Sequence, residues 1–375
     1  MIKSIRIRLE PNNKQNTKMF ASAGVSRFIY NWVLDMQESG HKNGGKFIGD
    51  GSLRKLLTVL KKEKEFSWLN DYSNNIAKQA VKDACDAYIK FFKKISSKPN
   101  FKSKRKSKPS FFQDSYKIKF TENKVRLEKI GWVRLSEKGR ICHDTKVYNP
   151  RITHDGLHWY LTVGVDVEEN EVELTGKSIG IDLGIKDLAI VSGIDEPFKN
   201  INKSKRVKSK EKKLRRLQRM VSRKYLKNKK GGSYVKTSNI IKLEKKILKV
   251  CRRLDNIRTD YIHKVTTTIV KTKPSRIVME NLNIKGMMKN KHLSKAIAAQ
   301  RFYEFRKFVE YKSKMFGIEF TEADRWYPSS KMCSKCGYIK TNLSLSERTF
   351  ECESCGNTID RDRNAEINLS RYKVS

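Results

Sequence analysis

The stretch that decides the fold is Cys352–Leu369, CESCGNTIDRDRNAEINL. It begins with two cysteines separated by two residues, a spacing typical of turns that present thiolates to a metal ion. Within a few residues it reaches Asp360 and Asp362, at the start of a segment with the pattern of a helix. Thiolates and carboxylates prefer different metal ions. The stretch therefore predicts a small metal-bound module that leads directly into a second, acidic site.

A second cysteine pair with the same spacing precedes this stretch, which gives C-x2-C-x15-C-x2-C. The arrangement fits one tetrahedral Zn²⁺, and a redox pair is disfavoured because both pairs repeat one geometry. Gly337 and Gly356 follow the second cysteine of each pair, where a tight turn needs a permissive backbone. Four thiolates fill the coordination shell of zinc, so we expect one structural ion that folds a ribbon. The predicted ligands are Cys333, Cys336, Cys352 and Cys355.

The chain is strongly basic. Its 375 residues include 82 Lys and Arg against 40 Asp and Glu, a formal charge of +42. Nucleic acid is the favoured partner because each phosphate contact releases counterions, and a membrane surface is the alternative. No segment reaches the ~18 apolar residues of a spanning helix, and the N-terminus lacks the apolar core of a signal peptide. We therefore expect a cytoplasmic protein without a membrane partner.

Two kinds of pattern divide the first half of the chain. Residues 2–11 alternate apolar and basic side chains, which predicts a strand, whereas residues 14–94 have the three- and four-residue spacing of helices. Residues 111–175 form short alternating runs typical of a small barrel or sheet. Before them lies a basic, proline-broken loop that we expect to face nucleic acid. Its candidate phosphate-binding residues are Lys102, Lys104, Arg105 and Lys106.

The second half alternates strands with helices, which predicts an α/β layer. We expect a strand–turn–strand at 177–192 and further strands at 275–282 and 318–323. Two basic helices joined by NKKGGS predict an antiparallel hairpin, and residues 292–317 predict one amphipathic helix. Within the hairpin, the apolar residues expected to pack together are Leu214, Leu217, Val221, Ile247, Val250 and Leu254.

Three acidic residues far apart in sequence stand at the ends of these elements. Asp182 follows one buried strand, Glu280 ends another, and Asp362 opens the last helix. Carboxylates at neighbouring strand ends suit two Mg²⁺ ions about 3.5–4 Å apart, as two-metal phosphoryl transfer requires. Each acid alone also has a structural explanation, as a turn former, a strand-end salt bridge or a helix N-cap. Together, in a chain of charge +42, they predict a catalytic site.

Several motifs resemble the TnpB (OrfB) family, whose members are encoded in bacterial and archaeal insertion sequences and are related to type V CRISPR effectors. The specific matches are GIDLGIKDLA, IVMENLNIKGM, VEYKSKMFG, YPSSKMCSKCG, RTFECESCG and DRDRNAEINL. Weaker matches upstream are PNNKQ, SRFIYNWVL, KPNFKSKRKSKPSF and KIGWVRL, so the resemblance covers nearly the whole chain. One departure is Glu366, where the family usually has a second small residue after Ala365.

The resemblance implies a RuvC-like (RNase H-like) nuclease core with an inserted zinc ribbon, and an N-terminal β-barrel, the wedge, with an inserted helical recognition domain. It places the catalytic triad on Asp182, Glu280 and Asp362, because the D-x-N-A pattern selects Asp362 over Asp360. It also places Arg348 near the scissile phosphate. The implied boundaries are 1–15 and 100–175 for the barrel, 16–99 for the recognition domain, 176–328 and 359–375 for the nuclease domain and 329–358 for the ribbon.

For function, the resemblance implies an RNA-guided DNA endonuclease. It also implies a prokaryotic protein that associates with the nucleoid in the cytoplasm. Its guide RNA would derive from the end of a transposable element, the protein would read a short flanking motif in double-stranded DNA, and pairing would read the target. No helix-turn-helix is evident and the ribbon lacks the spacing of a C₂H₂ finger, so the chain has no obvious base-reading module of its own.

Three other functions compete with this one. An RNA-guided DNA binder that does not cut would be expected to lose triad acids, and all three are present. A transposition protein acting in strand transfer would need an active-site tyrosine or serine, or an acid triad that also accepts a 3′-hydroxyl. The sequence singles out no such tyrosine or serine. A basic nucleic-acid chaperone would not need buried carboxylates.

Overall fold

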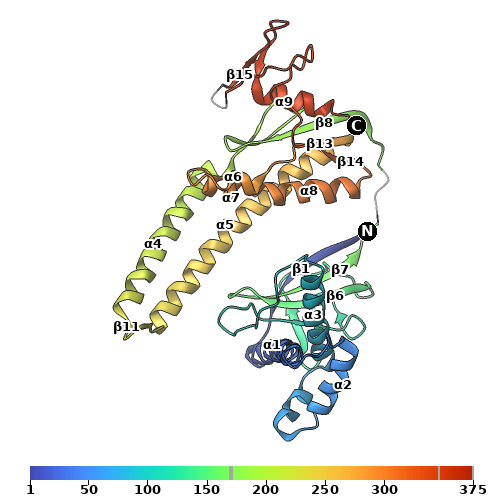
Figure 1. Ribbon diagram of the computed structural model, residues 1–375, viewed down its shortest axis with the longest axis vertical. Helices are drawn as coiled ribbons and strands as arrows, with labels where there is room; N and C mark the ends of the chain where they lie inside the picture. The colour runs from blue at the N-terminus through green and yellow to red at the C-terminus, as the bar shows by residue number, and fades with distance from the viewer. Residues whose placement is uncertain (169–171, 345–346, 374–375) are drawn as a thin grey trace. The chain divides into compact units, whose positions relative to one another are not determined.

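The computed structural model describes residues 1–168, 172–344 and 347–373 of the chain (Figure 1). The chain divides into two compact units, Met1–Val167 and Glu168–Ser375, and each has its own hydrophobic core. We call them the N-terminal unit and the C-terminal unit. Among the described residues, no helix is both long and apolar enough to span a bilayer.

An antiparallel sheet forms the centre of the N-terminal unit. Its order is β2-β6-β7-β1-β5-β4-β3, and β1 pairs with β7 from Ile2 to Leu9. The described residues show no pairing between the edge strands β2 and β3; of the small barrel or sheet that the sequence patterns predict, they form a sheet, and closure into the barrel that the resemblance implies is not seen among them. The strands are β1 (Ile2–Glu10), β2 (Ser110–Phe112), β3 (Lys119–Phe120), β4 (Lys124–Leu127), β5 (Gly131–Leu135), β6 (Val147–His154) and β7 (Trp159–Asp166).

Helices fill the first part of the N-terminal unit, as the spacing of apolar residues predicts. The longest begins with a capping box, in which the Asn12 side chain accepts from the Gln15 backbone N–H and the Gln15 side chain accepts from that of Asn12. Its buried face packs on the third helix and on the sheet in one continuous core. The helices are α1 (Asn13–Lys42), α2 (Asp50–Leu60), a 3₁₀ helix (Lys64–Asp71) and α3 (Asn74–Phe92).

A mixed five-stranded sheet with the order β10-β9-β8-β13-β14 organises the C-terminal unit. β8, β13 and β14 are parallel, so their carboxyl ends meet at one edge, whereas β9 runs antiparallel to β8. This is the α/β layer that the sequence predicts. The strands are β8 (Thr175–Leu183), β9 (Asp187–Val191), β10 (Phe198–Lys199), β13 (Pro274–Met279) and β14 (Glu319–Glu322).

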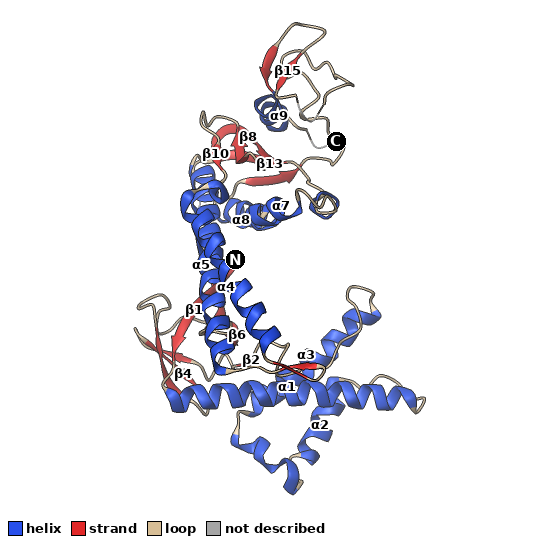
Figure 2. Ribbon diagram, turned by 90° about the vertical axis from the view of Figure 1, so that its left-hand side faces the viewer, coloured by secondary structure: helices blue, strands red, loops and turns tan. Residues whose placement is uncertain are grey.

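Helices cover both faces of this sheet (Figure 2). Successive side chains of a strand point to opposite faces, so Ile181 and Ile277 enter the core that contains α5 (Ser238–Lys271) and α8 (Phe302–Met315). Val278, which points the other way, packs against Leu369 of α9 (Arg361–Ser370). The alternation therefore decides which side chains of β8 and β13 face α9.

Gly180 lets α9 lie directly on β8. A Cβ atom at this position would come within 2.1 Å of the Glu366 carbonyl oxygen and 2.6 Å of the Ser370 backbone nitrogen. Both are backbone atoms of a helix, which cannot give way as a flexible side chain can. Close packing of the helix on the strand therefore requires glycine at position 180, the first residue of the sequence GIDLG.

A long antiparallel hairpin projects from the sheet, formed by α4 (Lys205–Lys227) and α5 and closed by the short strands β11 (Lys229–Lys230) and β12 (Ser233–Tyr234) (Figure 1). The predicted hairpin is confirmed, as are its contacts. The apolar residues named from the sequence form one cluster: Leu214, Leu217, Val221, Ile247, Val250 and Leu254.

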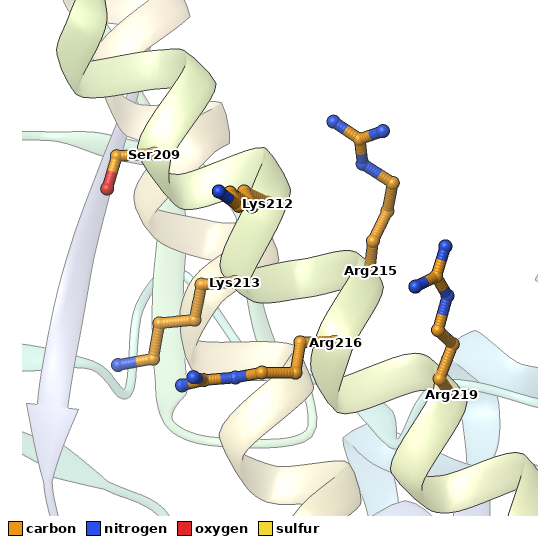
Figure 3. Close-up of a pocket in the computed structure, with 6 residues that line it drawn as sticks. All are labelled: Ser209, Lys212, Lys213, Arg215, Arg216 and Arg219. Carbon is orange, nitrogen blue, oxygen red and sulfur yellow. The ribbon is translucent and has the colours of Figure 1, made fainter.

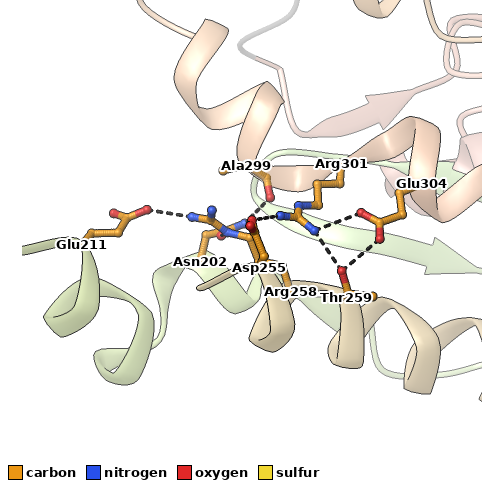
Figure 4. A network of polar contacts seen from close by, with 8 residues as sticks. All are labelled: Asn202, Glu211, Asp255, Arg258, Thr259, Ala299, Arg301 and Glu304. Carbon is orange, nitrogen blue, oxygen red and sulfur yellow. Dashed lines mark hydrogen bonds and ion pairs between the residues drawn. The ribbon is translucent and has the colours of Figure 1, made fainter. Parts of the chain in front are cut away.

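The prediction of a single helix at 292–317 is wrong, because the helical conformation is interrupted at Arg301. This residue has a φ of 57° and separates α7 (Ser294–Gln300) from α8. Its guanidinium donates to Thr259 and Glu304 and pairs with Asp255, which ties the junction to α5 (Figure 4). Tertiary hydrogen bonds thus hold a conformation that costs a non-glycine residue about 1–3 kcal/mol.

Candidate nuclease site and zinc ribbon

The four predicted zinc ligands lie together. Their Sγ atoms are all within 4.8 Å of one another, and two pairs are separated by 3.7 Å (Cys333 and Cys355) and 3.6 Å (Cys336 and Cys352). A tetrahedral ion with Zn–S bonds of 2.3 Å requires sulfurs about 3.8 Å apart, whereas a disulfide requires about 2.05 Å. The donor set therefore fits one tetrahedral Zn²⁺.

Two matching turns present these sulfurs. Gly337 donates its N–H to the Cys333 carbonyl at 2.9 Å, and Gly356 donates to the Cys352 carbonyl at 3.0 Å. Both glycines have positive φ, 79° and 66°, as the sequence predicts for these positions. Burial raises the pKa of the Cys333 thiol, but the backbone N–H groups of Cys336 and Lys335, together with hydrogen bonds from the Cys352 and Cys355 thiols, outweigh it and lower that pKa to about 6. The turns thus favour a thiolate at neutral pH.

Two buried asparagines fasten the ribbon to α9. Asn364 accepts from the Ser334 N–H at 2.9 Å and donates to the Met332 carbonyl at 2.6 Å. Asn368, one turn later, donates to the Met332 and Ser329 carbonyls. Sequence reasoning used Asn364 only as part of a pattern and missed this role, although two asparagines four residues apart inside a helix were an available signal. The ribbon therefore holds the helix that carries Asp362.

The structure brings the three predicted acids to one face of the sheet. Asp182 lies near the end of β8 and Glu280 directly follows β13, and both are even-numbered positions that point to the α9 side. Asp362 lies in the first turn of α9. The N-cap is Asp360, whose side chain accepts from the backbone N–H groups of Asp362 and Arg363 at 3.0 and 3.1 Å. The alternative explanation of Asp362 as an N-cap is therefore wrong.

The acids perturb one another as closely placed carboxylates do. Burial raises the pKa of the Asp182 carboxyl to about 8, and the charges of Glu280 and Asp362 add to the rise. Burial also raises the pKa of Glu280, while its hydrogen bond with Asp182 opposes the rise. Without a cation, the pair therefore shares a proton. Oxygen ligands of this kind fit Mg²⁺, which would take the place of that proton.

Among the described residues, the four cysteines are the one group of three or more side chains gathered closely enough to hold a metal ion, and the three acids do not form such a group. Asp182 and Glu280 interact directly, and the charge of Asp362 acts on Asp182.

Two arginines border the acids. Arg361 donates from Nε and Nη2 to Asp362 Oδ1, each at 3.3 Å, and its charge lowers the pKa of Asp182. The Nη1 atom of Arg348 lies 3.7 Å from Asp362 Oδ2, and its side chain is 53% exposed. Arg348, which was singled out from the sequence, thus stands beside the acids with room to reach a phosphate. Arg361 was not singled out.

The predicted basic loop is only partly available to a ligand. Lys104, Arg105 and Lys106 are exposed. Lys102 instead places its ammonium 3.3 Å from the centre of the Tyr30 ring, and its backbone N–H donates to Asn31. Burial lowers the pKa of Lys102.

Helix α4 carries a basic surface. The sequence showed that this helix is rich in Lys and Arg, but not that these side chains line one concavity. A cavity of about 610 Å³ on this helix is lined by Ser209 and five cations (Figure 3). Within the described residues, none of the five has an ion pair or a hydrogen bond to another side chain. Unpaired cations around one concavity repel each other, so the surface favours a polyanion. The five cations are Lys212, Lys213, Arg215, Arg216 and Arg219.

Three family models match the chain. A model of the OrfB family described as "Probable transposase" matches residues 161–291, and one described as a Cas12f1-like TNB domain matches residues 302–369. A third, described as a helix-turn-helix domain, matches residues 1–46, where this chain forms β1 and the single unbroken helix α1.

Whole-chain relatives agree with these models. The chain is 29% identical to "Putative RNA-guided DNA endonuclease InsQ" of Escherichia coli, over 98% of this chain and 91% of that protein. It is 28% identical to "Putative RNA-guided DNA endonuclease" of Streptomyces pristinaespiralis, over 98% and 88%. The solved structure of a Cas12f1–sgRNA–target DNA complex shares the fold, with a TM-score of 0.55 at 14% identity over 99% of this chain and 98% of that one.

The motifs, the zinc-ribbon ligands and the relatives therefore converge. The family models lie in both units, and the resemblance drawn from the sequence motifs is confirmed. The chain is similar to the TnpB (OrfB) family, through a family model that matches residues 161–291 and through relatives of 28–29% identity that span nearly all of it.

Proposed function

We propose that this protein is an RNA-guided endonuclease that cuts double-stranded DNA beside a short flanking motif. The observation that carries the proposal is the convergence of Asp182, Glu280 and Asp362 on one face at the carboxyl edge of the sheet. Relatives that span the chain are named as RNA-guided DNA endonucleases, and the Cas12f1 structure contains guide RNA and target DNA. Both support the proposal.

In this proposal the C-terminal unit contains a RuvC-like nuclease core. Asp182, Glu280 and Asp362 would hold two Mg²⁺ ions through their carboxylate oxygens. Bound there, the ions would activate a water and stabilise the departing 3′-oxygen. Arg348, whose side chain is 53% exposed beside Asp362, would neutralise the scissile phosphate as charge develops on it. The products would carry 5′-phosphate and 3′-hydroxyl ends.

The remaining parts would hold nucleic acid. The unpaired cations of α4 would contact the backbone of the guide RNA or its duplex with the target. Residues 1–15 and 100–175 would act as the wedge, residues 16–99 as the recognition domain and residues 329–358 as the ribbon that contacts the target, with 345–346 outside the described residues. Lys104, Arg105 and Lys106 would contact phosphates, and Lys102 would position the loop through Tyr30.

A non-cutting RNA-guided binder, or a transposition accessory protein, is less well supported. Such a protein has no need to bury Asp182 beside Glu280, because like charges in a desolvated site cost stability unless cations bind. That cost is explained if the acids hold catalytic ions.

The test is a cleavage assay with the full chain, Mg²⁺ and an RNA that carries a segment complementary to the target. RNA sequenced from the purified protein identifies the scaffold to which that segment is attached. A library of flanking sequences beside the target identifies the motif. We expect cutting only when RNA, target and motif are all present.

The matched control is Asp182→Ala, which should abolish cutting while target binding persists, because phosphate contacts supply the affinity. Cutting that ignores the RNA would leave only a Mg²⁺-dependent nuclease. Unchanged cutting by Asp182→Ala at matched Mg²⁺ would reject the assignment of the acids.

A further inference from the structure

The turn after β14 lies at the same edge of the sheet as the acids. β14 is parallel to β13 and in register with it, with Met279 opposite Glu322. The Ala323 N–H then donates to the Met279 carbonyl at 2.8 Å, so the segments that follow β13 and β14 leave the sheet side by side. Glu280 is the first residue after β13, and Trp326 lies three residues after Ala323 in the segment that follows β14. The strand order β8-β13-β14 thus places Asp182, Glu280 and this turn in succession along one edge.

Hydrogen bonds hold the turn in one conformation. The Asp324 carboxylate accepts from the Trp326 N–H at 2.8 Å, and the Asp324 carbonyl accepts from the Tyr327 N–H at 3.1 Å. The Asp324 N–H donates to the Tyr372 hydroxyl at 3.2 Å. The Tyr327 hydroxyl donates to the Asn368 carbonyl of α9 at 3.0 Å, and its ring packs edge-on against Tyr372. The turn is therefore fastened to the helix that begins with the catalytic acid.

This fixed turn presents Trp326 to solvent. Trp326 is 85% exposed, whereas its neighbour Tyr327 packs into a small core with Val278 and Leu369. Arg325 is also exposed and has no ion pair within the described residues. An exposed indole is unfavourable in water and contributes nothing to this core. Beside an unpaired guanidinium, it has the properties of a surface that stacks on a nucleotide base.

We propose that Trp326 stacks on a base of the DNA strand that is being cut, next to the catalytic acids; this rests on the proposed nuclease function. A strand in a duplex has its bases already stacked, so an indole gains a partner only when the strand is single. Phosphoryl transfer needs that strand held in line with the attacking water. Stacking does not depend on base identity, which suits a nuclease whose target sequence is read by pairing. Arg325 would contact an adjacent phosphate.

The variants are Trp326→Ala and Trp326→Phe in the full chain with guide RNA and Mg²⁺. The control is Tyr116→Ala: Tyr116 is 93% exposed and its N–H also donates to an aspartate two residues earlier, but it lies in the N-terminal unit. Trp326→Ala should raise KM for DNA by roughly 5- to 150-fold, with kcat changed less. Trp326→Phe should recover most of the loss, and the control should match the wild type.

A cycle with abasic DNA separates stacking from a structural role. Each substrate lacks one base at a successive position around the cut. At one or two positions, loss of the base should cost the wild type as much as Trp326→Ala does, and the two losses should not add. Additive losses at every position, or an unchanged KM for Trp326→Ala, would overturn the proposal.

A second readout does not require cutting. In an Asp182→Ala background, a single-stranded DNA with 2-aminopurine at the coupled position, or at each position in turn, should lose fluorescence on binding when Trp326 is present but not in Trp326→Ala. If the wild type fails to cut and this quenching is seen, the nuclease proposal fails and the stacking site stands. Equal quenching with and without Trp326 would overturn the stacking site itself.

Discussion

Asp182 in β8 and Glu280, which directly follows β13, point to the same face because both positions are even-numbered, and the odd-numbered residues of both strands enter the main core of the C-terminal unit. The apolar alternation is visible in the sequence, and it fixes the face to which both acids point. The sequence could therefore predict that both belong to one site. It could not predict their shared proton, because burial of a carboxyl depends on the helix that covers it. Glu366, a residue of that same helix α9, is also buried and is 4% exposed.

The buried acids predict an unusual pH dependence of stability. Burial raises the pKa of Asp182 to about 8 and that of Glu366 to about 7, and Glu366 Oε2 has no hydrogen-bond partner among the residues that the structure describes. An unfolded carboxyl titrates near 4, so between these values the folded state binds more protons and stability falls as pH rises. The Tm of the zinc-loaded protein without magnesium should fall from pH 5 to pH 9. Asp182→Asn and Glu366→Gln should each reduce that fall.

Glu366→Gln should also stabilise the protein at pH 8 by about 1–3 kcal/mol, since it removes a buried charge that lacks a partner. Magnesium should raise the Tm of the wild type at pH 8 and have little effect on Asp182→Asn. Thermal melts of the zinc-loaded protein without and with added Mg²⁺ measure both. A Tm that stays level or rises across this pH range would contradict the assigned shifts.

At the scale of elements, the position of Asp362 depends on how closely α9 packs on β8. Gly180→Ala should displace the helix, because the added Cβ would meet backbone atoms at 2.1 and 2.6 Å. We expect a loss of about 1–3 kcal/mol of stability and a larger relative loss of cleavage, since Asp362 moves with the helix. Gly176→Ala is the control, in the same strand with no atom within 4 Å of its added Cβ. Equal effects of the two substitutions would show that the close contact is unimportant.

The ribbon should act on the same helix. Elemental analysis should find one zinc per chain, and Cys352→Ser should lose it because three thiolates leave the shell open. Without the folded ribbon, Asn364 and Asn368 lose their partners Met332 and Ser334, so cleavage should fall as well. Cys142→Ser, at an exposed cysteine outside the cluster, should keep both zinc and activity. A folded, zinc-free wild type would exclude the metal site.

Sequence patterns predicted the helices and strands better than the junctions and contacts between them. The α4–α5 hairpin followed from periodicity alone, and its predicted contacts are confirmed. The break at Arg301 could not be seen, because partners on α5, distant in sequence, hold its left-handed backbone. The tie between Asn364 and the ribbon was hidden for a similar reason, since its partners lie 30 and 32 residues earlier. Local sequence patterns could not predict these contacts, because they join residues that are distant in the sequence.

Over the whole molecule, charge supplies affinity and leaves specificity to something else. The formal charge of +42 and the unpaired cations on α4 favour any polyanion. Such contacts position a nucleic acid without reading its bases. The stretch matched by a helix-turn-helix model is a strand and one long helix, so it does not present two short helices to a groove. Under the proposed function, sequence discrimination would come from pairing with a guide, together with recognition of the flanking motif.

This division of labour predicts a direction of mismatch sensitivity. Pairing must nucleate beside the flanking motif, where the protein first opens the duplex, and then extend away from it. Each target in a series carries one mismatch with the guide, at positions from the motif to the far end. Mismatches nearest the motif should prevent both binding and cutting, whereas distant ones should leave binding intact and slow only the cut. Binding measured with Asp182→Ala and cutting measured with the wild type separate the two effects. Equal sensitivity at every position would mean that pairing does not start at the motif, and insensitivity throughout would mean that the RNA does not guide.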